Sequence, residues 1–266
     1  MIRVGFLGDV VGKPGREMLK RYVKEMKTKF SLDFVVANCE NASGGFGLSA
    51  KNAVEIFEYG VDVITGGNHS FDKKDVLPLM QTLPILRPFN HYDNTDGKGV
   101  ITLKNSDGKS LSVINMLGAM GLNLVKNPFL SIDEALNLCE SKNILVDYHA
   151  EMTSEKMAFF WDNKERVSAV FGTHTHVGTD DLKISGNAVY VSDAGLVGAR
   201  EGVIGMDAAA SVAGFKTGIK HSFGVNEKYK KIFQMIVFEC ENGVSTDAFK
   251  IKIIDENEII TKAYND

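Results

Sequence analysis

The chain of 266 residues has an ordinary globular composition, with 44% hydrophobic and 24% charged residues, and its length fits one large domain or two small ones. Its formal net charge of −4 gives no basis for general nucleic-acid binding, and three widely spaced cysteines without a Cys-x-x-Cys motif predict reduced thiols in a cytosolic protein. No apolar run approaches the ~18 residues of a membrane span, and the apolar N-terminal stretch is too short for a signal peptide.

The first third of the sequence alternates between strand and helix patterns. Ser49 is a suitable N-cap for the second helix, and Gly60 is a suitable stop. The order strand–helix–strand is typical of a parallel sheet covered by helices. The predicted elements are strands at residues 2–8, 33–38 and 61–65 and helices at residues 15–30 and 50–59.

The remainder of the chain mixes hairpins with further strand and helix patterns. It contains neither repeats nor a proline-rich linker, so we expect a single domain over residues 1–266, built as a two-sheet α/β sandwich. The Gly- and Ala-rich segment 195–225 is a candidate flap over a cleft. The predicted elements are hairpins at 100–104 with 111–116 and at 232–238 with 244–254, helices at 132–141 and 153–164, and strands at 143–148, 167–171 and 189–192.

Metal-binding and acid–base side chains follow five of the predicted strands. In parallel α/β sheets ligands bind at this edge, where the strands end. Four of the six histidines of the chain lie there, which favours a functional site over chance. The residues in question are Asp9, Glu40, Asn41, Asn68, His69, His149, His174 and His176.

The ligand types predict a site for two divalent ions. His174 and His176 are two residues apart, and in extended backbone both side chains would point into one cavity. Imidazole, carboxylate and amide ligands suit Mn, Fe, Ni or Zn, and their number exceeds one tetrahedral site. Asp9 and Glu40 are the only anionic candidates, so a loaded site keeps about two positive charges and favours an anion such as a phosphate ester, without separating monoesters from diesters.

Each of these residues also has a structural explanation. Asp9 could cap the following helix, Asn68 could be a turn residue, and His149 could be a buried structural histidine. All these explanations would have to hold together to remove the site, which favours the metal hypothesis. The residues expected to lie outside the site are Cys39 as a buried thiol, His91 and His221 at the surface, and Lys228, Lys230 and Lys231 on a solvated rim.

Five segments occur in order over about two thirds of the chain: GDVVGKPGR (8–16), ANCENASGGFG (37–47), TGGNHSFD (65–72), DYHAE (147–151) and GTHTHVGTDD (172–181). Together they resemble the calcineurin-like metallophosphoesterase superfamily and, within it, the bacterial YmdB-like phosphodiesterases. The pieces ENASGGFG and GGNHSFD are typical of the subfamily. The resemblance implies a four-layer αββα sandwich of two mixed sheets flanked by helices, with a dimetal site at the carboxyl ends of the strands.

The resemblance also implies roles for the individual residues. Glu40 would bridge the two ions, and His69 would not bind metal but would protonate the leaving oxygen. The expected ions are Fe or Mn, with Zn, Ni or Mg as other options, and self-association into a homo-oligomer is expected. Asp9, Asn41 and His176 would complete one metal site, and Asn68, His149 and His174 the other.

The activity implied by the resemblance is hydrolysis of phosphodiesters, most of all 2′,3′-cyclic nucleotides, by a hydroxide bound to the two metals. The alternatives are a phosphomonoesterase, protein phosphatase or nuclease of the same superfamily, or a regulatory nucleotide-binding protein with vestigial catalysis. The absence of a basic stripe with interleaved aromatics speaks against a nuclease, and His69 speaks against a mere binder.

Two departures from the broader superfamily concern the first metal. The usual Asp-x-His motif is here Asp9-Val10-Val11, and Glu40 stands where an aspartate usually bridges, with Asn41 available to fill the vacancy. Both leave the occupancy of that site open. The glycines of Thr65-Gly66-Gly67 would let Asn68 and His69 share one tight turn. Phe46 in the Gly-rich loop 43–47 would either stack on a base or anchor the loop.

Overall fold

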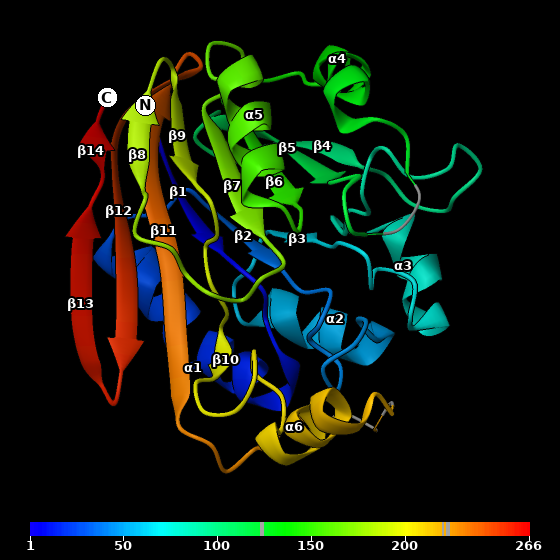
Figure 1. Cartoon of the computed structure of the whole chain (residues 1–266). Helices are drawn as coiled ribbons and strands as arrows, with labels where there is room; N and C mark the ends of the chain where they lie inside the picture. The colour runs from blue at the N-terminus through cyan, green and yellow to red at the C-terminus, as the bar shows by residue number, and fades with distance from the viewer. Residues whose placement is uncertain (123–124, 220, 222–223) are drawn as a thin grey trace.

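Two mixed β-sheets and the helices that flank them form the α/β fold of the computed structural model (Figure 1), which describes residues 1–122, 125–219, 221 and 224–266. This confirms the expected α/β fold with two mixed sheets. In the first sheet the order is β13-β12-β11-β1-β2-β3, with β10 beside β11. Its strands are β1 (Ile2–Leu7), β2 (Phe34–Asn38), β3 (Val63–Thr65), β10 (Gly198–Ala199), β11 (Lys231–Glu241), β12 (Val244–Ile254) and β13 (Asn257–Lys262).

The second sheet has the order β14-β8-β9-β7-β6-β5-β4. β5, β6, β7 and β9 run parallel to one another, as β1, β2 and β3 do in the first sheet, so each sheet has a parallel centre. Its strands are β4 (Val100–Lys104), β5 (Ser110–Leu117), β6 (Ile144–His149), β7 (Ala169–Thr173), β8 (Lys183–Ser185), β9 (Ala188–Val191) and β14 (Tyr264–Asn265).

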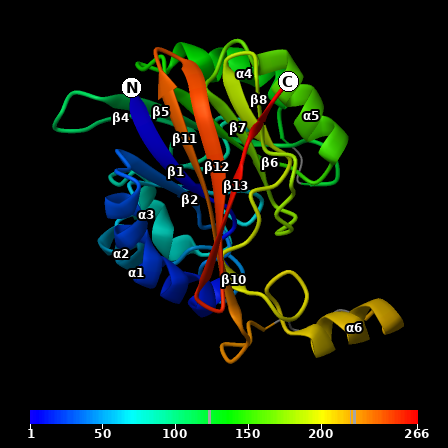
Figure 2. The same cartoon turned by 90° about the vertical axis from the view of Figure 1, so that its left-hand side faces the viewer.

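Three hydrophobic clusters follow from the alternation of side chains along the strands. Val4 and Phe6 of β1 point into a cluster shared with Phe171 and other strand residues of both sheets, so this cluster lies between the sheets. A second cluster joins the first sheet to α1 and α2, and a third joins the second sheet to α4 and α5. The turned view in Figure 2 shows the helices on the two outer sides and α6 standing apart.

The described helices mostly match the predicted ones. Ser49 caps α2 as predicted, accepting from the backbone of Asn52, and Gly60 has a φ of 104°. The helix predicted at residues 132–141 is α4, four residues earlier, because the Asn127 side chain caps it and Pro128 begins it. The helices are α1 (Gly12–Lys29), α2 (Ala50–Glu58), the 3₁₀ turn η1 (Lys74–Val76), α3 (Leu77–Met80), α4 (Pro128–Asn137), α5 (Thr153–Asn163) and α6 (Ala208–Thr217).

The elements absent from the predictions are short or exposed: η1, α3, α6, β8, β10, β13 and β14. α6 has only Ser211 buried, so it lacks the apolar stripe that reveals a helix in a sequence. It begins at the Asp207 side chain and ends at Gly218, which has a left-handed backbone. Within the described ranges, no helix combines the length and the apolar character needed to cross a membrane.

Candidate metal and catalytic site

The carboxyl ends of the parallel strands of both sheets meet in one place. β1, β2 and β3 bring Asp9, Glu40 and Asn68, while β6 and β7 bring His149 and the loop that follows Thr173. The Glu40 Oε1 atom lies 3.1 Å from Nε2 of His149, and Asp9 Oδ1 lies 3.6 Å from Nε2 of His176. The predicted site residues are therefore brought together from two sheets.

Three ligand-type atoms converge on the Nε2 atom of His149. Asn68 Oδ1 lies 3.0 Å from it, Glu40 Oε1 3.1 Å and His174 Nδ1 3.1 Å. The ligand atoms of Glu40, His149 and His174 all lie within 4.8 Å of one another. Such a cluster of oxygen and nitrogen atoms around one centre can hold a divalent ion.

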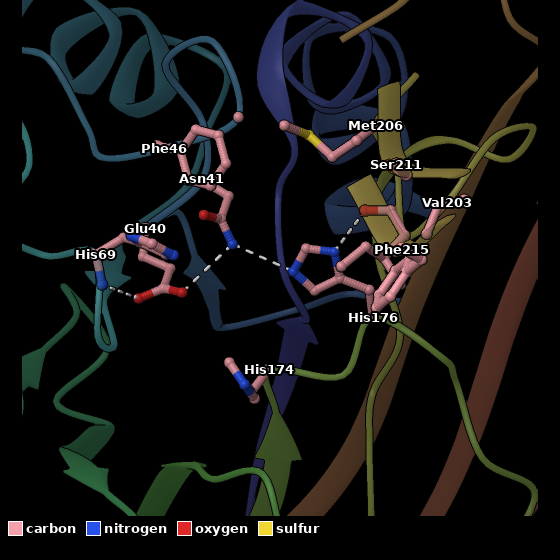
Figure 3. Close-up of a pocket in the computed structure, with 12 residues that line it drawn as sticks. Glu40, Asn41, Phe46, His69, His174, His176, Val203, Met206, Ser211 and Phe215 are labelled. Carbon is pink, nitrogen blue, oxygen red and sulfur yellow. Dashed lines mark hydrogen bonds between the residues drawn. The ribbon is translucent and has the colours of Figure 1, made fainter. Parts of the chain in front are cut away.

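A second group of side chains shares Glu40 with the first. The Asn41 amide lies 3.3 Å from Glu40 Oε1 and 3.2 Å from Nε2 of His176, which in turn faces Asp9. The nitrogen of the Asn41 amide points toward both neighbours, and a half-turn about its last bond exchanges the nitrogen for the oxygen. Figure 3 shows Glu40, Asn41 and His176 in this row.

The three clustered histidines each have their other ring nitrogen bound to an acceptor. Thr173 Oγ1 donates to Asp147 Oδ1 at 2.7 Å, so it accepts from Nδ1 of His149 at 2.9 Å. His176 Nδ1 donates to the Ile204 carbonyl at 2.7 Å, and His174 Nε2 lies 2.8 Å from Glu151 Oε2. These partners leave the lone pair of the remaining nitrogen directed into the cluster, which is the arrangement of metal-ligating histidines.

Two further observations fit a cation at this place. Asp9 Oδ1 is fully buried without a hydrogen-bond partner, an expensive state for a carboxylate oxygen unless a cation satisfies it. Gly67 lies so close to the cluster that a Cβ atom would come within 2.4 Å of Glu40 Oε2 and 2.3 Å of His149. The glycine thus keeps the space that the ligands need, through close packing rather than through a left-handed backbone.

The charges of the cluster perturb its pKa values strongly. Burial raises the pKa of the Asp9 and Glu40 carboxyls, but the facing His176 and His149 more than offset this and bring both pKa values below their ordinary range. Burial lowers the pKa of His176, and Asp9 overcomes it and raises that pKa to about 9. Likewise Glu40 raises the pKa of His149 against burial. The carboxylates therefore attract positive charge to this place, as a cation-binding site does.

His174 and His176 reach the pocket by an unexpected route. The extended backbone predicted for them is wrong, since β7 ends at Thr173 and the two histidines have φ values of 100° and 65°. Left-handed backbone is costly for residues other than glycine and needs support from its surroundings. Asp193 supplies it, accepting from the backbone nitrogen and the hydroxyl of Thr175 at 3.0 and 2.8 Å.

His69 lies at the rim of the cluster. Its backbone nitrogen donates to Glu40 Oε2 at 2.8 Å, and its Nδ1 atom lies 2.8 Å from Asp72 Oδ2. The side chain of His69 is 30% exposed, unlike the fully buried His149. A half-exposed imidazole held through one nitrogen presents the other to the pocket, as a proton donor would.

A pocket of about 250 Å³ opens beside these residues. One part of its lining is polar, from Glu40, Asn41, His69, His174 and His176. The other part is an apolar wall, which we define as Phe46, Val203, Ile204, Met206 and Phe215. Figure 3 shows Phe46 and Met206 above Asn41 and His176, with His174 below them. Phe46 also lies edge-on to the ring of His69, with 5.1 Å between centroids.

The residues predicted to lie elsewhere mostly do so. Cys39 is fully buried, and burial raises the pKa of its thiol. His221 is exposed, but His91 is half-buried, because its ring packs edge-on against Phe71 with 5.0 Å between centroids. The structural explanation of Asp9 as a helix cap is wrong, since Val11 is the N-cap of α1. Lys228 and Lys230 are exposed as predicted for the rim, whereas Lys231 is half-buried beside Glu17.

Several residues that support the site were missed from the sequence. Asp72, Asp147 and Glu151 are acids within two or three residues of a predicted site histidine, and that spacing was the available signal. Asp147 is fully buried, and burial raises its pKa to about 6 against the bonds from Thr65, Thr173 and Asn38. No sequence signal pointed to Asp193, which pairs with the buried Lys156 at 3.2 Å.

Comparisons with known proteins find relatives in sequence and in fold. The family model of YmdB-like proteins matches residues 6–254. A Bacillus subtilis (strain 168) protein named 2′,3′-cyclic-nucleotide 2′-phosphodiesterase is 42% identical over 231 residues, covering 85% of this chain and 87% of that protein. A crystal structure of a hypothetical protein from Thermus thermophilus superposes with a TM-score of 0.89 at 32% identity, covering 98% of this chain and all (100%) of the other. The structure of a novel phosphatase from Mycoplasma pneumoniae gives a TM-score of 0.88 at 32% identity, covering 95% of this chain and 93% of that one.

Proposed function

The chain belongs to the YmdB-like family, and on that premise we propose that it is a metal-dependent phosphodiesterase that hydrolyses 2′,3′-cyclic nucleotides. The observation that carries the proposal is the convergence of Asn68, Glu40 and His174 on Nε2 of His149, about 3 Å away in each case. The proposed substrate is the one named for the Bacillus subtilis relative, and it is consistent with an anion-seeking site beside an apolar wall.

Two groups of ligands would hold the metal ions. Bound ions of this kind lower the pKa of a coordinated water and neutralise the charge of a phosphate ester. Iron or manganese is proposed on the family resemblance, because imidazole and carboxylate ligands do not by themselves select one divalent ion. In the proposed sets Glu40 is shared, with Asp9, Asn41 and His176 on one side and Asn68, His149 and His174 on the other.

His69 is the proposed general acid. Asp72 accepts from its Nδ1 atom at 2.8 Å, which fixes the orientation of the ring. The Nε2 proton would then pass to the ribose oxygen as its bond to phosphorus breaks. Because the His69 backbone nitrogen also donates to Glu40, the acid stands at a set distance from the proposed metal position.

The other predictions from the sequence remain proposals. We propose one domain over residues 1–266, with the segment 195–225, which we name the arm, as a flap over the pocket. Residues 220, 222 and 223 of that segment lie outside the described residues. The cytosolic location, the homo-oligomer and the four-layer arrangement with a dimetal centre are proposed on the same basis. Phe46 is proposed to contact the base, because it lines the pocket next to His69.

Metal analysis of the purified protein, coupled to a substrate panel, tests the proposal. The panel compares 2′,3′-cyclic AMP with 3′,5′-cyclic AMP, bis-nitrophenyl phosphate and a nitrophenyl monoester. We expect about two equivalents of metal per chain and the fastest turnover on the 2′,3′-cyclic substrate. Two metals with monoesterase activity alone would contradict the diesterase proposal, and neither metal nor turnover after addition of Mn would contradict the site itself.

A further inference from the structure

The turn from Val203 to Met206 is joined to the ligand cluster, because the Ile204 carbonyl accepts from His176 at 2.7 Å. Val203 and Met206 exchange two backbone hydrogen bonds, at 3.0 and 2.9 Å, and so close a two-residue hairpin loop. The central residues Ile204 and Gly205 have φ values of 47° and 90°. Positive φ at both positions is what a type I′ turn requires, and Asn-Gly is the sequence that suits it best.

Isoleucine strongly disfavours the backbone conformation that Ile204 adopts here. A β-branched side chain in left-handed backbone is a steric outlier, and such strain persists where the surroundings impose it, most often at functional sites. Nothing in the turn itself needs an isoleucine, because the contact to His176 comes from the main-chain carbonyl. Its side chain is 49% exposed and lines the pocket, so its stabilising contacts with the rest of the fold are few.

The chemistry of the wall limits what it can recognise. Among the described residues that form it, Phe46, Ile204 and Phe215 have no side-chain hydrogen-bonding group, and Phe215 is 89% exposed. The nearby Ser211 hydroxyl is engaged, since it donates to the Asp207 carbonyl at 3.0 Å. Such a wall offers area to a flat ring and, among these side chains, no free hydrogen-bond donor to its polar edge.

We propose that the apolar wall is a subsite for the nucleobase, which it recognises by its flat faces and not by its edge, and that Ile204 is its specificity-determining residue. The inference rests on the proposed function. The enzyme would accept adenine and guanine about equally and would bind purines more tightly than pyrimidines, because purines bury more surface. Hydrogen-bonding sites behave otherwise, rejecting an unmatched analogue by factors of about 10⁴–10⁵.

Equilibrium binding separates this inference from the proposed function. Calorimetry on the Mn-loaded full chain would compare adenosine 3′-monophosphate, guanosine 3′-monophosphate and ribose 3-phosphate. We expect the two nucleotides to bind within about threefold of each other and about tenfold more tightly than ribose phosphate, a gain typical of one buried apolar group. Equal affinity for all three ligands, or a preference above about 100-fold between the two nucleotides, would overturn the inference whether or not the protein hydrolyses cyclic nucleotides.

Ile204→Asn provides the second arm of the test. Asparagine suits the turn, so we expect Tm to rise by about 2–4 °C while the affinity advantage of the nucleotides over ribose phosphate falls about fivefold. Ser31→Asn is the matched control, because Ser31 also has a positive φ, of 52°, and lies outside the pocket. It should raise Tm without changing that advantage. If Ile204→Asn left the affinity of the nucleotides relative to ribose phosphate unchanged, Ile204 would not determine the specificity of the site.

Discussion

The pocket has two sides that are built in different ways. The ligand cluster stands on the ends of buried strands, and Asp9, Glu40 and His149 are almost or completely inaccessible to solvent. The apolar wall stands mainly on the arm, residues 195–225, where Ile204 and Phe215 are largely exposed and α6 has one buried residue. Metal binding and proton transfer need fixed distances, so they need the scaffold, whereas an apolar wall needs only area.

The two sides also differ in what they do to stability. The cluster buries several carboxylates and imidazoles together. Each buried charge loses its favourable hydration, which destabilises the fold unless an oppositely charged partner offsets the loss. Ile204 and Phe215 of the apolar wall leave much of their side chains in water, where they contribute little to folding, whereas Met206 is buried. Substitutions in the cluster should therefore change chemistry and stability strongly, while those at the exposed wall residues should change binding and little else.

Glu40→Gln should have the largest effect. It keeps the shape of the side chain but removes the carboxylate that both ligand groups share, so metal should be lost and turnover should fall by more than about 10⁴, the upper end for loss of a general acid alone. Elemental analysis and steady-state rates measure both quantities. Glu227→Gln, at an exposed acid that follows the arm in sequence, is the control. Retention of two metal equivalents in Glu40→Gln would refute the shared-ligand arrangement.

His69→Ala should come next, with turnover reduced about 10²–10⁴-fold at unchanged metal content. Asp72→Asn should give a smaller loss, about 10–100-fold, because it disturbs the orientation of His69 and leaves the imidazole in place. Metal content measured on the same samples distinguishes the roles. If His69→Ala lost metal in proportion to its loss of turnover, His69 would be a metal ligand and not the general acid.

Lys250→Met tests how much a buried charge in the sheet scaffold lowers the stability of the fold. Burial, reinforced by Lys252, lowers the pKa of Lys250 to about 8 from 10.5. The unfolded chain therefore binds more protons between these values, so the penalty is fully present below about pH 8 and disappears as the pH rises to 10.5. We expect the variant to be about 1–2 kcal/mol more stable than the parent at pH 7 and to lose that advantage by pH 10, since each pKa unit is worth about 1.4 kcal/mol and the bond to Thr179 is lost. Urea unfolding of both proteins from pH 7 to pH 10 measures the difference in their free energies of unfolding. A difference that does not change with pH would contradict this prediction.

Phe215→Ser should have the smallest effect on the fold. The side chain is 89% exposed, so the free energy of unfolding should change by less than about 0.5 kcal/mol. Nucleotide affinity should fall measurably, since the ring is part of the apolar wall. Leu130→Ser, at an exposed position outside the pocket, serves as the comparison. A large loss of stability in Phe215→Ser would mean that the arm is part of the core after all.

The scaffold side was the more predictable one. Its strands are apolar and end in polar residues, and both features are local in the sequence, so Asp9, Glu40 and His149 could be grouped before any coordinates. Asp193, which supports the turn of His174 and His176 through Thr175, could not be predicted. It lies 37 positions from its partner Lys156 and meets it only through the packing of the chain. The left-handed backbone of His174 and His176 could not be predicted either, because histidine at these positions does not signal a positive φ.

The segment of the arm was singled out in the sequence as a candidate flap, but its helix and its turn were not predicted. α6 is short of buried residues, so no periodic pattern marked it, although Asp207 and Gly218 bound it in the usual way. The turn at Ile204 and Gly205 carries one glycine but not the Asn-Gly pair that reveals such turns. Residues that contradict a local rule are hard to predict, and their presence points to a role for them.

The hydrogen bond from His176 to Ile204 has a consequence for how proteins of this architecture can diverge. The acceptor is a main-chain carbonyl, which every amino acid carries. Side chains along the arm can therefore be exchanged without removing the bond that orients the ligand. Descendants of one ancestor could change the molecules they accept while the metal centre stays as it was, and sequence variation between them should gather on the arm.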